Sequence, residues 1–96
     1  MNDSHRLEAR IEGQVQGVYF RARARAQAIA LGVTGMVRNR ADGSVETVAE
    51  GARAALEQYA AWLQQGPPQA KVKRVTLNWS EARKDFTRFE VAPDAP

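Results

Sequence analysis

A β-hairpin in the middle of the chain is the sequence feature that most limits its fold. Two short runs rich in β-branched residues, 33–39 (VTGMVRN) and 44–50 (SVETVAE), flank the segment 40–43, which ends in Asp42-Gly43. Asp-Gly is a strong signal for the tight turns that join antiparallel strands. We therefore expect two neighbouring strands here, and the remaining elements must pack around this hairpin.

A helix is expected on each side of the hairpin. Residues 21–31 (RARARAQAIAL) alternate like a strand, but Ala, Arg and Gln favour helices over strands. One helical face would then carry Phe20, Ala24, Ala28 and Leu31, with Gly32 as the stop signal. Residues 52–64 form a second amphipathic pattern, whose apolar stripe consists of Ala52, Ala55, Leu56, Tyr59, Ala60 and Leu63. Gly66-Pro67-Pro68 ends that helix because proline cannot continue it.

The outer segments complete the pattern of elements. Apolar residues alternate along 7–15 and 72–79, which predicts two more strands, and a short last strand is expected around Phe86, Phe89 and Val91. The tail, 92–96, is expected to fray. The order β-α-β-β-α-β predicts an α+β, ferredoxin-like fold, with both helices on one face of a mainly antiparallel sheet and a short extra C-terminal strand.

Composition limits the chain to one small domain. With 96 residues, 44% of them hydrophobic, we expect a single domain over 1–96 with its core at about 7–91. The absence of cysteine excludes disulfides and thiolate nucleophiles and suits a reducing compartment. The N-terminus is charged and no apolar run approaches the length of a membrane span, so a cytoplasmic protein without a signal peptide is expected. The net charge of +3 suits a small anionic ligand, or solubility alone.

The stretch GQVQGVYFR, residues 13–21, lies between the first strand and the first helix. The first backbone N–H groups of a helix have no partners within it, and its dipole adds about half a positive charge there. Glycines would let the loop curl around a phosphate, and Arg21 would add a charged grip. Alternatively, Gly13 and Gly17 only shape a turn and Arg21 is solvated. The stretch lacks the glycine and lysine pattern of the common phosphate loops, so the residues alone leave both interpretations open.

The wider sequence resembles the acylphosphatase family. The matching stretches, spread over residues 7–91, are VQGVYFR (15–21), LGVTGMVRN (31–39), DGSVETVAEG (42–51), WLQQGPP (62–68) and VKRVTLNW (72–79). The resemblance implies a ferredoxin-like enzyme that hydrolyses the carboxyl–phosphate bond of small acyl phosphates without a metal or cofactor. The family's catalytic arginine falls on Arg21 and its catalytic asparagine on Asn39. Its phosphate-binding loop, which acts mainly through backbone N–H groups, falls on Val15, Gln16, Gly17, Val18, Tyr19 and Phe20.

The implied roles agree with the chemistry of phosphoryl transfer, which depends mostly on positioning and charge stabilisation. Arg21 would neutralise phosphoryl oxygens, and the amide of Asn39 would orient the attacking water. Gln16 is expected to be structural. Two residues depart from the common pattern: Tyr19 stands where many bacterial-type members have glycine, and Met36 stands where tryptophan is frequent.

Other charged residues are expected to play no part in the chemistry. His5 is placed before the first strand, at a frayed N-terminus, as a surface residue. Arg23 and Arg25 are expected on a solvated helix face, where Arg25 could add electrostatic steering of anions. Lys71, Lys73 and Arg74 are expected to be solubility charges on an edge strand. The acidic residues show no metal-ligand spacing, so no metal site is predicted.

Two other classes of function remain as alternatives. One is a non-catalytic phosphate- or anion-binding module, such as the acylphosphatase-like domain of a hydrogenase maturation carbamoyltransferase; the short chain favours a free-standing enzyme. The other is an RNA-binding module, but no strand carries the aromatic pattern of RNA-recognition domains. We therefore expect a monomer that binds a small acyl phosphate, with no nucleic-acid or membrane partner. Inorganic phosphate or sulfate could occupy the same loop.

Overall fold

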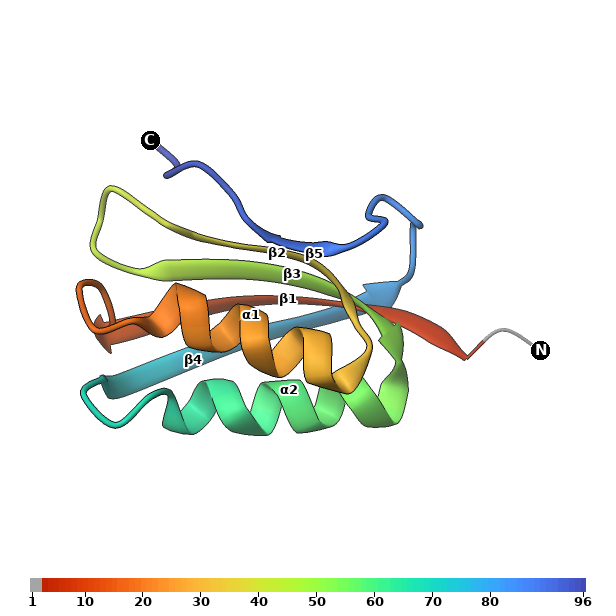
Figure 1. The fold of residues 1–96 in the computed structure, drawn as a ribbon, viewed down its shortest axis with the longest axis horizontal. Coiled ribbons are helices and arrows are strands. Elements are labelled where there is room, and N and C mark those ends of the chain that lie inside the picture. The colour runs from red at the N-terminus through yellow and green to blue at the C-terminus, as the bar shows by residue number, and fades with distance from the viewer. Residues whose placement is uncertain (1–2) are drawn as a thin grey trace.

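The computed structural model describes residues 3–96, and its elements follow the predicted order. They are β1 (Ser4–Gln14), α1 (Phe20–Leu31), β2 (Thr34–Asn39), β3 (Val45–Ala52), α2 (Arg53–Gln65), β4 (Lys71–Glu81) and β5 (Phe89–Val91). The turn between β2 and β3 contains Asp42-Gly43, so the hairpin prediction is confirmed. Both helices lie on one side of the sheet (Figure 1).

The five strands form one sheet in the order β4-β1-β3-β2-β5. All neighbouring strands are antiparallel except β2 and β5, which are parallel. This arrangement is the predicted ferredoxin-like α+β fold with an added C-terminal strand. It places the β1–α1 loop and the β2–β3 hairpin turn at the same end of the molecule (Figure 1).

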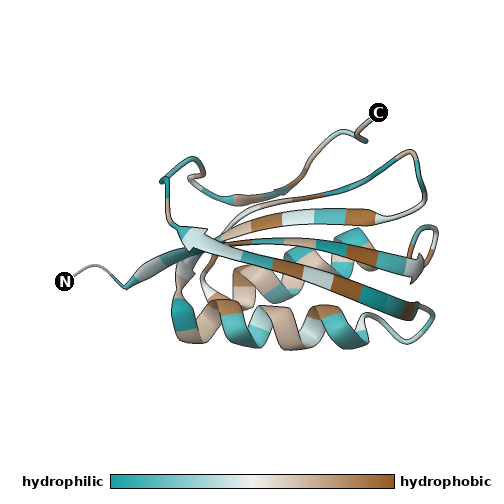
Figure 2. Cartoon of the chain, turned by 180° about the vertical axis from the view of Figure 1, so that it is seen from behind, coloured by the Kyte–Doolittle hydropathy of each residue, from teal (hydrophilic) through white to brown (hydrophobic). Residues whose placement is uncertain are grey.

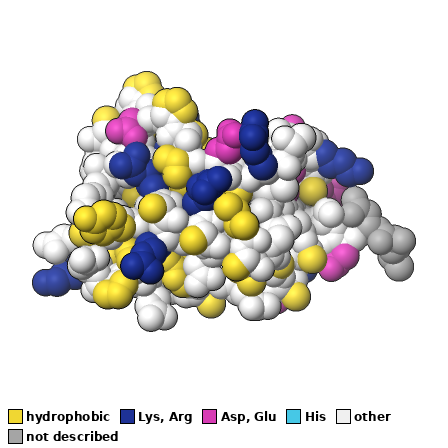
Figure 3. Space-filling view, in the orientation of Figure 1, with side chains coloured by type: hydrophobic (Ala, Val, Ile, Leu, Met, Phe, Trp, Pro, Cys, Tyr) yellow, Lys and Arg dark blue, Asp and Glu magenta, His cyan; other side chains and the backbone are white. Residues whose placement is uncertain are grey.

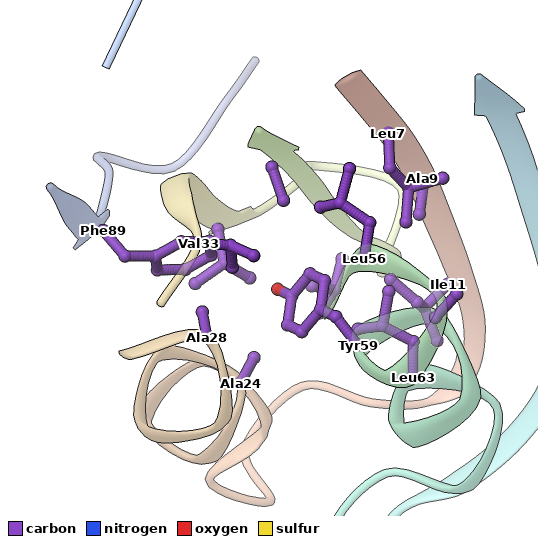
Figure 4. Close-up of a cluster of buried hydrophobic side chains, with 14 of the residues drawn as sticks. Leu7, Ala9, Ile11, Ala24, Ala28, Val33, Leu56, Tyr59, Leu63 and Phe89 are labelled. Atoms are coloured by element: carbon purple, nitrogen blue, oxygen red, sulfur yellow. The ribbon is translucent and has the colours of Figure 1, made fainter. Parts of the chain in front are cut away.

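The core lies between the sheet and the two helices. Tyr59 and Leu56 of α2 and Phe20 of α1 are fully or almost fully buried there. Figure 4 shows side chains from both helices and from the strands converging on this layer. Along the strands, hydrophobic and hydrophilic residues alternate (Figure 2), because successive side chains of a strand point to opposite faces.

Several predicted boundaries move by a few residues. Helix α1 begins at Phe20, and Ala52 is the last residue of β3 instead of the first of a helix. Phe86 lies outside β5. The placement of His5 before the first strand is wrong, because His5 lies within β1, opposite Gly51 and Glu81.

The prediction of a frayed tail is also wrong. The backbone N–H of Ala92 donates to Val37 O at 2.9 Å, and that of Ala95 donates to Asn39 O at 2.8 Å. Ala95 is buried, and it forms an isolated parallel bridge with Arg40. The tail therefore continues along the outer edge of β2, whose backbone groups there would otherwise lack partners.

Candidate active site

The two glycines of the β1–α1 segment are required for different reasons. Gly13 has φ +131° at a bulge in β1, where a Cβ atom would lie 2.2 Å from the carbonyl oxygen of Lys71. Gly17 has φ +73°, and a Cβ atom there would meet nothing within 4 Å, so conformation alone favours glycine. Gly13 thus brings the chain close against β4, and Gly17 turns the 15–19 loop toward the start of α1.

The N-terminus of α1 presents backbone N–H groups for which residues 3–96 provide no helical or capping partner. The first hydrogen bond of the helix runs from Arg23 N to Tyr19 O at 3.1 Å, so the amides of Phe20, Arg21 and Ala22 precede it. No side chain of the described residues caps this end, and no acidic residue lies in the first turn. With the helix dipole adding partial positive charge, this end of α1 favours an anion.

A pocket of about 460 Å³ opens at this helix end. Its lining residues are Val15, Gly17, Tyr19, Phe20, Arg21, Ala22, Asn39 and Val91. The fold thus brings the two predicted catalytic residues, Arg21 and Asn39, to one pocket together with most of the predicted loop. Two predicted loop residues, Gln16 and Val18, are not part of its lining.

Gln16 and Val18 instead hold the 15–19 loop in place. The side-chain Nε2 of Gln16 donates to the carbonyl oxygens of Arg40 at 2.8 Å and Ser44 at 2.9 Å. Val18 packs against the hydrophobic core. The loop is therefore tied to the β2–β3 hairpin turn, and these contacts fit the structural role expected for Gln16.

Asn39 ends β2 and is buried, with 9% of its surface exposed. Its Oδ1 atom has no hydrogen-bond partner among the described residues. A buried oxygen without a donor is unfavourable, and such groups in native proteins usually serve a ligand, a water or a functional role. Asn39 therefore retains an unused acceptor beside the pocket.

Arg21 is the second residue of α1, and its side chain is 39% exposed. One of its guanidinium nitrogens, Nη1, lies 3.3 Å from Oδ1 of Asp94, a tail residue that is itself 65% exposed. Exposed pairs of this kind contribute little to stability. The guanidinium is thus held near the pocket by a contact that an anionic ligand could replace.

Sequence reasoning missed two residues of this neighbourhood. Val91 was expected only as part of a strand, yet it lines the pocket. Asp94 was assigned to a frayed tail, and no local signal in the sequence indicates that it meets Arg21. The parallel pairing of β5 and the tail with β2 places both residues beside the pocket.

The remaining basic residues separate into two groups. Arg23 is exposed, as expected, whereas Arg25 Nε donates to Phe89 O at 3.2 Å and so joins α1 to β5. Arg25 is exposed as well, as expected, and this contact with Phe89 is an addition that the sequence did not indicate. Lys71, Lys73 and Arg74 are exposed on β4, which is an edge strand as predicted.

The described residues contain no cluster of three or more His, Cys, Asp or Glu side chains that could hold a metal ion. Within residues 3–96, neither helix has the length and apolar character needed to cross a membrane.

The fold and the pocket define a small α+β domain in which a pocket opens at an uncapped helix N-terminus. Residues 7–91 match the family model described as Acylphosphatase. An acylphosphatase from Pelotomaculum thermopropionicum is 50% identical over 82 residues, covering 85% of this chain and 89% of the relative. An acylphosphatase from Thiobacillus denitrificans is 49% identical over 88 residues, which cover 92% of this chain and 97% of that relative.

A solved structure agrees with these sequence matches. The structure of an acylphosphatase from Coxiella burnetii aligns with a TM-score of 0.88 and 37% identity, covering 94% of each chain. This protein therefore belongs to the acylphosphatase family.

Proposed function

We propose that this protein hydrolyses the carboxyl–phosphate bond of small acyl phosphates, releasing a carboxylate and phosphate. Membership of the acylphosphatase family supports this assignment. The observation that carries it is one pocket that combines an anion-binding helix end, the Arg21 guanidinium and the unpaired oxygen of Asn39. A non-catalytic anion-binding module or an RNA-binding module is not favoured, because the relatives that are 49–50% identical to this chain are named acylphosphatases.

In this proposal the phosphoryl group binds at the N-terminus of α1. The backbone amides of the 15–19 loop and of the first turn surround it, and Arg21 exchanges Asp94 for phosphoryl oxygens. Negative charge spread over those oxygens in the transition state is stabilised by donors that are already in position. The carboxylate is a good leaving group, so the protein is not required to supply a strong acid.

Asn39 orients the attacking water in line with the bond that breaks. Its amide can both donate and accept hydrogen bonds, but it is too weak a base to remove a proton. None of the pocket-lining residues is a carboxylate or a histidine. We therefore assign the proton of the water to an oxygen of the substrate's own phosphoryl group.

The test is hydrolysis of benzoyl phosphate, followed by ultraviolet absorbance with EDTA present, in the wild type, Arg21→Ala and Asn39→Ala. We expect metal-independent activity that falls by about 10²–10³-fold in Arg21→Ala, the usual effect of removing one well-placed donor. Asn39→Ala should also lose most of its activity. Arg23→Ala, which removes an exposed arginine of the same helix outside this pocket, is the matched control and should keep full activity.

Three outcomes would change the assignment. Full activity in Asn39→Ala would exclude its water-orienting role. Activity abolished by EDTA would contradict the metal-independent mechanism. A wild type that binds inorganic phosphate but hydrolyses nothing would indicate an anion-binding module, and a high 260/280 nm absorbance ratio that a salt wash lowers would indicate bound RNA.

We further propose that the protein acts as a cytoplasmic monomer. The absence of cysteine from the sequence suits a reducing compartment. Size-exclusion chromatography with light scattering tests the monomer, since a dimer would show twice the 10.6 kDa mass of the chain.

A further inference from the structure

Large hydrophobic side chains are rarely exposed in the described part of this protein, and two of them lie at the candidate active site. Tyr19 is 69% exposed and Val91 is 42% exposed, and both line the pocket that contains Arg21 and Asn39. They come from segments far apart in the sequence, the 15–19 loop and β5. Exposed apolar groups that the fold gathers beside a binding site often contact a ligand.

The backbone at Tyr19 gives a second, independent observation. Tyr19 has φ 65° and ψ 20°, the left-handed conformation that costs energy for any residue with a side chain and is unusual for an aromatic one. Glycine would adopt this conformation without that penalty, as Gly17 does two residues earlier. The tyrosine ring is thus kept at a backbone position that disfavours it, and strain of this kind concentrates at functional sites.

The position of the ring relative to the charged groups indicates what it could contact. If the phosphoryl group binds at the helix amides and Arg21, the acyl group has to occupy another part of the same pocket, whose lining includes Tyr19 and Val91. Figure 3 shows hydrophobic side chains next to Lys or Arg side chains at the left end of the molecule, where the 15–19 loop lies. The lining of the pocket itself combines the cationic side chain of Arg21 with the apolar groups of Tyr19 and Val91, so it offers a charged part and an apolar part to one substrate.

We propose that Tyr19 and Val91 form the subsite for the acyl group and favour acyl phosphates with an aromatic or extended apolar acyl chain. This inference rests on the proposed function and adds the class of substrate to it. An aromatic acyl group would stack on the Tyr19 ring and contact Val91, whereas an acetyl group is too small to cover much of either. The tyrosine hydroxyl has no part in this contact.

The experiment compares kcat/KM for benzoyl phosphate and acetyl phosphate, both measured by phosphate release. Tyr19→Gly keeps the left-handed backbone and removes the ring, so it should lower the benzoyl-to-acetyl ratio by about 3- to 10-fold, mainly through a higher KM for benzoyl phosphate. Tyr19→Phe should keep the ratio of the wild type. Val91→Ala should lower the ratio by a smaller factor. Ile29→Ala is the matched control, because Ile29 is an exposed apolar residue of α1 that does not line the pocket.

Failure of the acyl subsite and failure of the proposed function give different results. If Tyr19→Gly lowers kcat/KM for both substrates by the same factor, the ring acts on the loop and the acyl subsite is excluded. If Tyr19→Gly leaves both values unchanged, the subsite is also excluded, while the proposed hydrolysis stands. If the wild type hydrolyses neither substrate, the proposed function itself is wrong.

Discussion

Two arginine–carboxylate pairs at opposite ends of the molecule use the same chemistry in different surroundings. Nη1 of Arg6 lies 2.9 Å from Oε2 of Glu50, and the two side chains are 9% and 5% exposed. This pair lies near the end of the molecule where the segment 82–88 crosses from β4 to β5 (Figure 1). Nη1 of Arg21 lies 3.3 Å from Oδ1 of Asp94 beside the pocket, and these two side chains are 39% and 65% exposed. Burial and the number of further partners decide what each pair can do.

Both members of the Arg6–Glu50 pair have further hydrogen-bond or ion-pair partners. Glu50 also accepts the backbone N–H groups of Arg83 at 2.8 Å and Asp85 at 3.3 Å, and Arg6 also contacts Glu8 and Asp85. Burial alone would raise the pKa of Glu50, but these donors outweigh it and hold the pKa below its usual value of 4.5. The pair thus fastens the 82–88 segment, and the next residues form β5.

The Arg21–Asp94 pair has no such support. Among the described residues, each of the two side chains forms its ion pair with the other, and both are exposed to water. The strength of the pair is therefore small and sensitive to salt, as it is for most exposed pairs. A buried, multiply bonded arginine thus serves the fold, whereas an exposed, singly bonded one remains available to a ligand.

The largest effect expected from this comparison is on stability. Arg6→Ala leaves the buried carboxylate of Glu50 without its cation, which should lower the free energy of unfolding by about 3–5 kcal/mol. Urea unfolding measures it, and Arg88→Ala, which removes an exposed arginine paired with Glu90, is the matched control, with an expected change of about 0–1 kcal/mol. Equal losses in the two variants would contradict the structural role of the buried pair.

A second effect concerns the pH dependence of stability. Because the pKa of Glu50 is lower in the folded protein than in the unfolded chain, its contribution is complete above about pH 4.5 and is lost as the pH falls below that value. Glu50→Gln should therefore unfold more easily near neutral pH but lose less stability than the wild type on acidification. Chemical unfolding at several pH values tests this. Glu57→Gln, at an exposed position in α2, should keep the wild-type dependence.

The smallest effect is expected at the exposed pair. Asp94→Asn removes a carboxylate that competes with phosphate for Arg21, so inorganic phosphate should inhibit hydrolysis at a lower concentration. The inhibition constant for phosphate should fall by no more than about fivefold, because an exposed ion pair contributes about 1 kcal/mol at most. Stability should be unchanged in urea unfolding. A weaker inhibition by phosphate would mean instead that Asp94 positions Arg21.

The sequence was sufficient to predict most of the fold. The Asp42-Gly43 turn, the two apolar helical faces and the alternation along 7–15 depend on neighbouring residues, and these local patterns predict the observed order of elements. The assignment of Arg21 and Asn39 depended on the family resemblance, since an arginine after a glycine loop and an asparagine at a strand end are ambiguous alone. Their catalytic roles remain predictions.

The sequence by itself determined the order of the elements and, through its resemblance to a known family, the pair of residues expected to act on phosphate. Only the tertiary structure decided which carboxylate meets which arginine, that the tail lies along β2, and that Val91 joins Tyr19 at the pocket. The physical reason is the range of the contacts. Helical and strand periodicity arises from residues that are close together in the sequence. Asp94 contacts Arg21 because β5 and the tail pair with β2, and these residues are too far apart in the sequence for a local pattern to indicate the contact.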